Sequence, residues 1–230
     1  MRRLPGLFIT GTDTGVGKTY VAALVAKALR EQGLRVGIYK PAASGCRREE
    51  GQLISEDAAA LWEAAGRPGE LSQVCPQLFA APLAPHLAAK AEGKRLDAAL
   101  LRSGLDYWTA RSDVLLVEGA GGLMSPLGED EYVADLAYDF DFPLLVVSRN
   151  VLGTINQTLQ TLIAAAAFSE DELSVAGVVL NHPSPPTSDD ASLASNRAEL
   201  VHRCIPPVLA EVFFGSDRFD REIDWRGLMG

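Results

Sequence analysis

A glycine-rich segment that ends in Lys-Thr constrains the fold of this chain more than any other stretch. Residues 11–19 read GTDTGVGKT; they follow an apolar run at 7–10 and precede an amphipathic helix that begins near Lys18. Between a strand and a helix, the backbone N–H groups of such a loop and of the helix N-terminus point at one anion. The lysine adds a positive charge and the threonine hydroxyl can bind Mg²⁺, so the segment predicts a site for a nucleoside triphosphate.

The loop departs in one position from the strict pattern G-x-x-x-x-G-K-[ST]. The pattern requires glycine where the chain has Thr12, and the chain places glycine one residue earlier, at Gly11. An ordinary glycine-rich turn between a strand and a helix is the alternative interpretation. The flanking strand and helix favour phosphate binding, because they put the loop where that mechanism needs it.

Composition narrows the classes of partner and compartment. The length of 230 residues suits one large α/β domain, which we expect to span 1–230. The net charge of −9 disfavours nucleic acid and an anionic membrane surface as partners. Three dispersed cysteines without a C-x-x-C motif predict neither a zinc site nor disulfides. With no apolar run of membrane-spanning length and no export signal, we expect a cytoplasmic protein.

Strands and helices alternate along the chain. Apolar runs at 113–117, 143–147 and 175–180 are typical of strands buried on both faces. The alternation predicts an α/β fold with a doubly wound, mostly parallel sheet and helices on both faces, like that of P-loop NTPases; ligands then bind at the carboxyl ends of the strands. Further strands are expected at 34–39 and 207–210, helices at 56–65, 87–92, 97–109, 157–168 and 192–203, and loops at 41–55 and 182–191.

Charged side chains follow two of the expected strands. Lys40 comes directly after the strand at 34–39, and Glu118 comes directly after four apolar residues. A carboxylate there is costly to bury unless a cation meets it, and a Mg²⁺ ion bound by Thr19 would do so. The alternatives are a solvated lysine and an exposed glutamate in a tight turn. Asp57, near the start of a helix, is explained on spacing alone by the helix dipole.

Taken together, these segments resemble the dethiobiotin synthetase family of biotin biosynthesis. The resemblance rests on 11–19, on YKPAASG at 39–45, on Asp57, and on PH at 85–86, EGAGG at 118–122 and LGTIN at 152–156. It implies closure of a ureido ring: 7,8-diaminononanoate takes up CO₂ as a carbamate, which ATP activates before the second amine closes the ring. The implied cofactors are ATP and Mg²⁺, and the implied assembly is a homodimer.

The resemblance also implies roles for individual residues. Lys40 and Lys18 are implied to be catalytic, with Lys40 steadying the carbamate and the transferring phosphoryl group. Thr19, Asp57 and Glu118 are implied to bind the metal, which replaces the dipole explanation of Asp57. The substrate residues are implied to be Thr14, Ser44, Gly153, Thr154 and Asn156, the last three acting across the dimer interface. The nucleotide residues are implied to be Thr14, Gly15, Val16, Gly17, Lys18, Thr19, Tyr20, Glu118, Gly119, Ala120, Gly121, Asn181, His182, Val212, Phe213 and Phe214.

The chain departs from the family around the base of the nucleotide. His182 stands where Asp is frequent, and residues 211–214 read EVFF where members often have Glu-Ile-Pro-Trp. A partition or septum-site P-loop ATPase is the alternative function. Those enzymes carry a second lysine about five residues before the main one, where this chain has Asp13.

Overall fold

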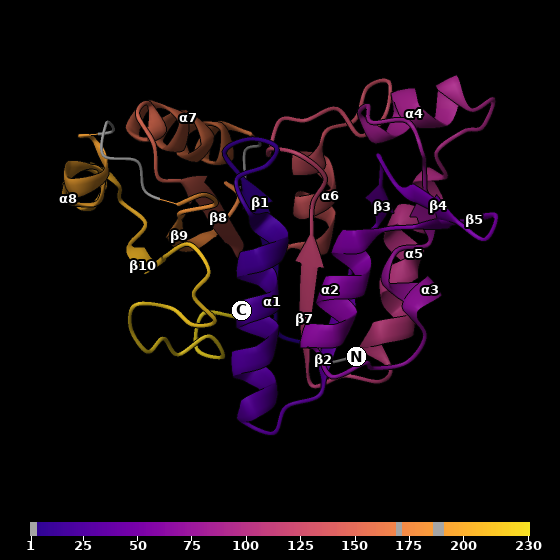
Figure 1. Ribbon diagram of the computed structural model, residues 1–230, viewed down its shortest axis with the longest axis horizontal. Helices are drawn as coiled ribbons and strands as arrows, with labels where there is room; N and C mark the ends of the chain where they lie inside the picture. Colours follow the sequence, from indigo (N-terminus) through magenta and orange to yellow (C-terminus); the bar gives the residue numbers. More distant parts are fainter. Residues whose placement is uncertain (1–3, 169–171, 186–190) are drawn as a thin grey trace.

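A parallel sheet of six strands forms the centre of the protein (Figure 1). The structure is a computed structural model that describes residues 4–168, 172–185 and 191–230. Strand order is β10-β9-β8-β1-β7-β2, and every neighbouring pair is parallel, which confirms the predicted fold class. The strands are β1 (Gly6–Gly11), β2 (Val36–Tyr39), β7 (Val114–Glu118), β8 (Leu144–Arg149), β9 (Val175–Asn181) and β10 (Val208–Val212).

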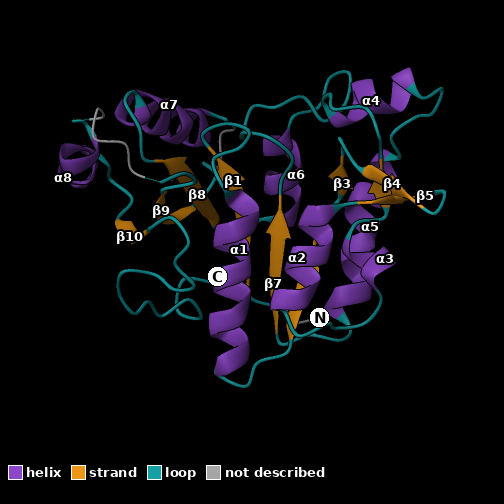
Figure 2. Ribbon diagram, viewed as in Figure 1, coloured by secondary structure: helices purple, strands orange, loops and turns teal. Residues whose placement is uncertain are grey.

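Helices cover both faces of the sheet (Figure 2). In that view α1 and α2, which pack against each other, lie in front of the sheet and α6 lies behind it. The helices are α1 (Lys18–Glu31), α2 (Glu56–Ala64), α3 (Leu71–Val74), α4 (Pro85–Ala91), α5 (Ala98–Thr109), α6 (Val133–Phe140), α7 (Thr154–Ala167) and α8 (Leu193–Arg203). Within the described residues, no helix is long and apolar enough to cross a membrane.

The central strands are mostly apolar because both of their faces are covered. Every residue of β1 and β7 is buried, including Phe8, which pairs in register with Val117 on one side and Leu144 on the other. Burying such runs supplies the main driving force for the fold, and parallel pairing turns the carboxyl ends of the strands to one edge. Ligand-binding loops are expected at that edge.

Residues 41–55 are more ordered than the predicted loop. A short strand β3 (Ala42–Ala43) pairs with β6 (Gln77–Leu78), and β4 (Arg47–Glu49) forms an antiparallel hairpin with β5 (Gln52–Ile54). The prediction was wrong because these strands are two or three residues long and β4 is wholly polar and exposed, so no alternation marks them.

Three helices also differ from the sequence prediction. The short α3 and the α6 helix were not predicted. The α7 helix begins three residues earlier than expected, after Gly153, whose φ of 95° places it in the left-handed region that favours glycine. Of the loop predicted at 182–191, residues 186–190 lie outside the described residues.

Gly104 allows α5 to approach β2 closely. A Cβ added to Gly104 would lie 2.7 Å from Cζ of Tyr39, a contact closer than van der Waals distance. The buried Tyr39 hydroxyl donates to the carbonyl oxygens of Leu100 and Leu101, at 2.9 and 3.1 Å, and this fixes the ring beneath the helix. Glycine in a helix is therefore required here by tertiary packing.

We predict that Gly104→Ala destabilises the protein. In an ordinary helix interior alanine is more stable than glycine by about 1 kcal/mol, but the clash with Tyr39 reverses the sign, as overpacking costs about 1–3 kcal/mol. Urea denaturation of Gly104→Ala and of the exposed neighbour Ser103→Ala gives the free energies of unfolding. Only Gly104→Ala should fall below the parent protein; a Gly104→Ala protein as stable as the parent would contradict the packing argument.

Candidate active site

In the loop between β1 and α1, the backbone N–H groups of residues 15–17 have no hydrogen-bond partner among the described residues. Gly15 and Gly17 have φ values of 73° and 93°, in the left-handed region that favours glycine. Gly17 occupies the N-cap of α1 and has no side chain to cap it. The first N–H groups of α1 can therefore bind a ligand. A Cβ on Gly17 would overlap the amide of Asn181, which donates to the carbonyl oxygen of Val16 at 2.8 Å. The loop therefore has the geometry of an anion site.

Lys18, the first residue of α1, folds back over this loop. Its Nζ donates to the carbonyl oxygen of Asp13 at 3.1 Å, and the residue is 8% exposed. Burial lowers the pKa of Lys18, while the carboxylate of Glu118 acts in the opposite direction. The ammonium thus occupies a desolvated position where an incoming anion meets little competing water.

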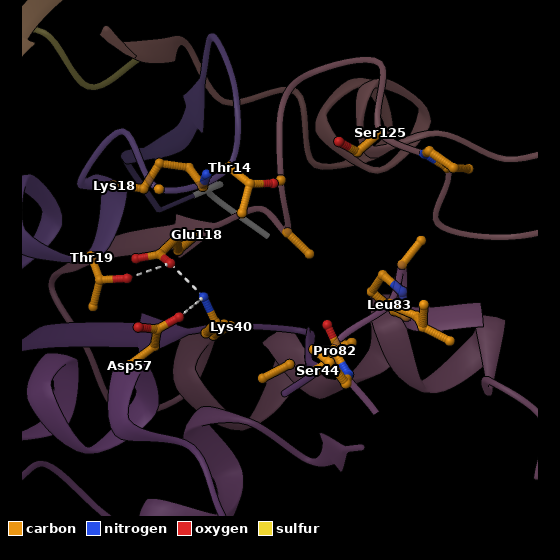
Figure 3. Close-up of a pocket in the computed structure, with 18 of the residues that line it drawn as sticks. Thr14, Lys18, Thr19, Lys40, Ser44, Asp57, Pro82, Leu83, Glu118 and Ser125 are labelled. Carbon is orange, nitrogen blue, oxygen red and sulfur yellow. Dashed lines mark hydrogen bonds and ion pairs between the residues drawn. The ribbon is translucent and has the colours of Figure 1, made fainter. Parts of the chain in front are cut away.

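A buried lysine joins two carboxylates at the edge of the sheet. Lys40 Nζ lies 2.5 Å from Glu118 Oε1 and 2.9 Å from Asp57 Oδ2 (Figure 3). Lys40 directly follows β2, Glu118 ends β7, and Asp57 is the second residue of α2. The Ser55 hydroxyl accepts from the N–H of Ala58 and caps α2, which fixes the turn that carries Asp57. Three elements distant in sequence therefore meet at one charge cluster.

The cluster keeps Lys40 charged despite its burial. Desolvation alone would lower the pKa of Lys40, but the charges of Glu118 and Asp57 outweigh it and raise that pKa. Desolvation would likewise raise the pKa of Asp57, and the Lys40 ammonium reverses this, so that the Asp57 pKa lies below its usual value. At neutral pH the lysine is a cation and Asp57 an anion.

The oxygen atoms around this cluster suit a small divalent cation. Thr19 Oγ1 donates to Glu118 Oε1 at 2.9 Å, and Asp57 lies on the same side of Lys40 as Thr19 (Figure 3). Glu118 Oε2 is buried and has no hydrogen-bond partner among the described residues, a costly state that a ligand would relieve. Hydroxyl and carboxylate oxygens are the ligands that Mg²⁺ prefers. No group of three or more His, Cys, Asp or Glu suited to a metal occurs in the described part of the chain, so such an ion would need ligand oxygens from the nucleotide or water as well.

These residues line one cavity of about 630 Å³. Lys18, Thr19 and Glu118 lie at one end of it in Figure 3, and Ser44 lies at the other. The cavity brings together most of the predicted phosphate, metal and substrate residues. Sequence reasoning missed eight further lining residues: Ala42, Ala43, Pro82, Leu83, Ala84, Pro85, Ser125 and Pro126. Of these, Ala42, Ala43 and Pro85 belong to segments that carry the family resemblance, and no sequence pattern marks the others.

The residues at the start of α7 do not line this cavity. Thr154 is buried and its hydroxyl lies 2.8 Å from that of Ser148, whereas Gly153 and Asn156 are exposed. Tyr20 also points elsewhere, because its hydroxyl donates to the carbonyl oxygen of Ser216 in the C-terminal segment. The structure therefore separates these predicted residues from the charge cluster.

The predicted base-binding residues gather at the ends of β9 and β10. His182 Nε2 lies 3.3 Å from Glu211 Oε1 and 3.2 Å from Asn150 Nδ2, and its ring lies 5.0 Å from that of Phe213, centroid to centroid. Val212 is buried, while Phe213 and Phe214 are about half exposed, at 52% and 54%. With Asn181 against the phosphate loop, aromatic and polar groups converge beside the nucleotide end of the site.

Comparison with solved structures shows the fold. The ParA family ATPase from Chlorobium tepidum superposes with a TM-score of 0.53 at 18% identity, covering 91% of this chain and 83% of that one. The signal recognition particle receptor FtsY from Elizabethkingia anophelis, in complex with GDP, gives 0.51 at 15% identity, covering 95% and 59%. At such identities the likeness concerns the arrangement of strands and helices, and it agrees with the predicted P-loop NTPase type.

Comparison of sequences shows the family. A family model described as an AAA domain matches residues 5–213. The ATP-dependent dethiobiotin synthetase BioD of Rhodopirellula baltica is 42% identical over 216 residues, covering 89% of this chain and 82% of the relative. The enzyme of the same name from Anaeromyxobacter dehalogenans strain 2CP-C is 45% identical, covering 86% of each. With this identity over most of both lengths, the chain belongs to the dethiobiotin synthetase family.

Proposed function

We propose that this protein uses ATP, Mg²⁺ and CO₂ to close the ureido ring of 7,8-diaminononanoate, releasing dethiobiotin, ADP and phosphate. The observation that carries the proposal is the Lys40 ammonium, held between Glu118 and Asp57 in the cavity that also contains Lys18 and Thr19. A charged, desolvated lysine beside a phosphate loop suits a reaction in which negative charge moves between a carbamate and a phosphoryl group.

The reaction needs no protein nucleophile. One amine of the substrate attacks CO₂ and loses a proton, which leaves a carbamate. A carbamate oxygen attacks the γ-phosphorus of ATP and ADP leaves. The second amine then attacks the carbamate carbon, phosphate leaves, and that nitrogen loses a proton. Lys18 neutralises the β- and γ-phosphate oxygens, and Lys40 orients the carbamate toward them. Placement of three reactants in one water-poor cavity supplies the rate enhancement.

Thr19, Glu118 and Asp57 are the residues that would hold the metal. Mg²⁺, when bound, neutralises charge on the phosphate oxygens and draws them into place. Glu118 Oε2, buried without a partner among the described residues, is the atom that most needs such a ligand. Lys40 shares both carboxylates in the structure, so it balances their charge whenever the metal is away.

The substrate spans the far end of the cavity in this proposal. Ser44, at that end, and Thr14, beside Lys18 on the phosphate loop, both line the cavity and would bind the diamine end. The exposed Gly153 and Asn156 at the start of α7 suit a carboxylate, because the N-terminus of that helix favours an anion. They lie outside the cavity of their own protomer, so we propose a homodimer in which the partner supplies them.

Base recognition and cell location complete the proposal. Asn181, His182, Val212, Phe213 and Phe214 would bind adenine, with Gly15, Val16, Gly17, Tyr20 and Gly119 to Gly121 along the rest of the nucleotide. Cys46, Cys75 and Cys204 are free thiols, which fits the reducing cytoplasm. We propose that residues 1–230 act as a single domain.

Purified protein should release phosphate only when diaminononanoate, bicarbonate, ATP and Mg²⁺ are all present. Omission of each component in turn, with phosphate measured enzymatically and dethiobiotin by mass spectrometry, tests the assignment. Omission of Mg²⁺ should abolish release, because no divalent cation would then neutralise the negative charge of the phosphate oxygens. Phosphate release that does not depend on the diamine would refute the proposed function and favour a simple ATPase.

Lys40→Ala should lower kcat by at least about two to three orders of magnitude, the range found when one charge-stabilising donor is removed. Lys27→Ala is the matched control, since Lys27 lies in α1 and its one ion pair among the described residues is with the exposed Asp217, at 3.8 Å. Circular dichroism should show both variants folded. A Lys40→Ala enzyme with near-parental kcat would remove Lys40 from the mechanism.

The dimer proposal predicts that two defective variants restore activity when mixed. Lys40→Ala lacks the charge cluster, and Asn156→Asp puts a carboxylate opposite the substrate carboxylate. After unfolding and refolding together at equal amounts, about a quarter of parental activity should return, because half of the dimers are mixed and each then has one intact site. No gain over the separate variants would show that each protomer completes its own site.

A further inference from the structure

We propose that Glu92 is a positioning residue that fixes the substrate-facing wall formed by Pro82, Leu83, Ala84 and Pro85, here called the 82–85 wall. The inference rests on the proposed function, since it takes the far end of the cavity as the diamine site. Glu92 does not line the cavity itself. It acts through the backbone that carries the wall.

The carboxylate of Glu92 accepts two backbone hydrogen bonds just before the wall. Its Oε1 accepts from the N–H of Ala80 at 2.6 Å and from the N–H of Ala81 at 3.2 Å. Its Oε2 accepts from Lys94 Nζ at 2.9 Å. Glu92 itself follows α4, the helix that begins at Pro85, so it connects the two ends of the segment that carries the wall.

The charge of Glu92 does not stabilise α4, but it strengthens the hydrogen bonds that hold the wall. A negative charge at a helix C-terminus opposes the helix dipole, so α4 gains nothing from a glutamate there. The Lys94 ammonium, aided by the N–H groups of Ala81 and Ala80, holds the pKa of Glu92 below its usual value. The side chain is therefore an anion at neutral pH, and charged acceptors form the stronger hydrogen bonds.

Among the described residues, the exposed half of the wall has few other contacts. Pro82 and Leu83 are exposed, with Leu83 at 47%, whereas Pro85 is buried as the first residue of α4. Ala81, just before the wall, packs against a small apolar cluster of Phe79, Ala88 and Ala89. Besides Glu92, a backbone hydrogen bond ties the start of the wall to the segment after β3: the N–H of Gly45 donates to the carbonyl oxygen of Ala81 at 3.1 Å. Figure 3 shows Pro82 and Leu83 beside Ser44, away from the phosphate end. Loss of Glu92 should thus loosen substrate contacts while leaving the charge cluster intact.

The test compares Glu92→Ala with Glu92→Gln in the full chain. Glutamine keeps an oxygen that can accept both N–H groups, whereas alanine removes it. Glu92→Ala should raise KM for diaminononanoate about tenfold, with kcat and KM for ATP within about twofold, and Glu92→Gln should stay within about threefold of the parent. In the protein without ligands, hydrogen exchange of residues 79–85 should be faster in Glu92→Ala only.

Two control variants separate positioning from charge and from global stability. Lys94→Ala removes the ion pair but leaves both backbone bonds, and Glu199→Ala breaks an exposed pair with Arg203 within α8; both should leave KM unchanged. An unchanged KM or unchanged exchange in Glu92→Ala would overturn the inference, as would an equal KM increase in Glu92→Gln or a joint loss of kcat and ATP affinity. If the parent shows no diamine-dependent phosphate release, the proposed function fails and the exchange measurement alone decides the role of Glu92.

Discussion

The site depends on the buried ion pair between Lys40 and Glu118. Such a pair is expensive to form, because both ions leave water, and removing one partner typically costs about 3–5 kcal/mol. The sheet makes the pair possible: β2 and β7 pair in parallel with Tyr39 opposite Val117, so the next residues of both strands, Lys40 and Glu118, fall side by side at the carboxyl edge. A buried charge is tolerated here because strand register supplies its counter-ion.

The same register places the phosphate loop. β1 lies on the other side of β7, with Ile9 opposite Glu118, so the chain that leaves β1 must pass over the carboxylate before α1 begins. Thr19, in the first turn of α1, then reaches Glu118 at 2.9 Å. Positive charge from Lys18 and Lys40 and negative charge from Glu118 and Asp57 are thereby held on rigid elements, as preorganised electrostatic catalysis requires.

From residue patterns alone, the sequence predicts the site residues that lie at strand ends and in glycine-rich loops, and few of the others. Lys40 and Glu118 follow apolar runs, so their place at the edge follows from parallel topology. The place of Asp57 does not follow from topology: spacing assigned it to the helix dipole, only the family resemblance implied a metal role, and the structure brings it to 2.9 Å from Lys40. Pro82, Leu83 and Ser125 carry no local signal, since the hydrogen bonds that position their loops come from residues distant in the chain or from short turns. Strand β3 could not be predicted for the same reason, because its two alanines show no hydrophobic alternation.

The cavity therefore joins two parts built in different ways. Its phosphate end is made by consecutive strands of the sheet, where any shift would separate buried charges, so its geometry tolerates little change. Its far end is made by the 82–85 wall and the turn at Ser125, which are held by a few local bonds such as that from the N–H of Gly122 to the Ser125 hydroxyl, at 2.8 Å. Local stability follows the density of buried contacts. If the proposed function holds, the chemistry belongs to the sheet, and we expect discrimination between substrates of different shape to depend on the loops at the far end.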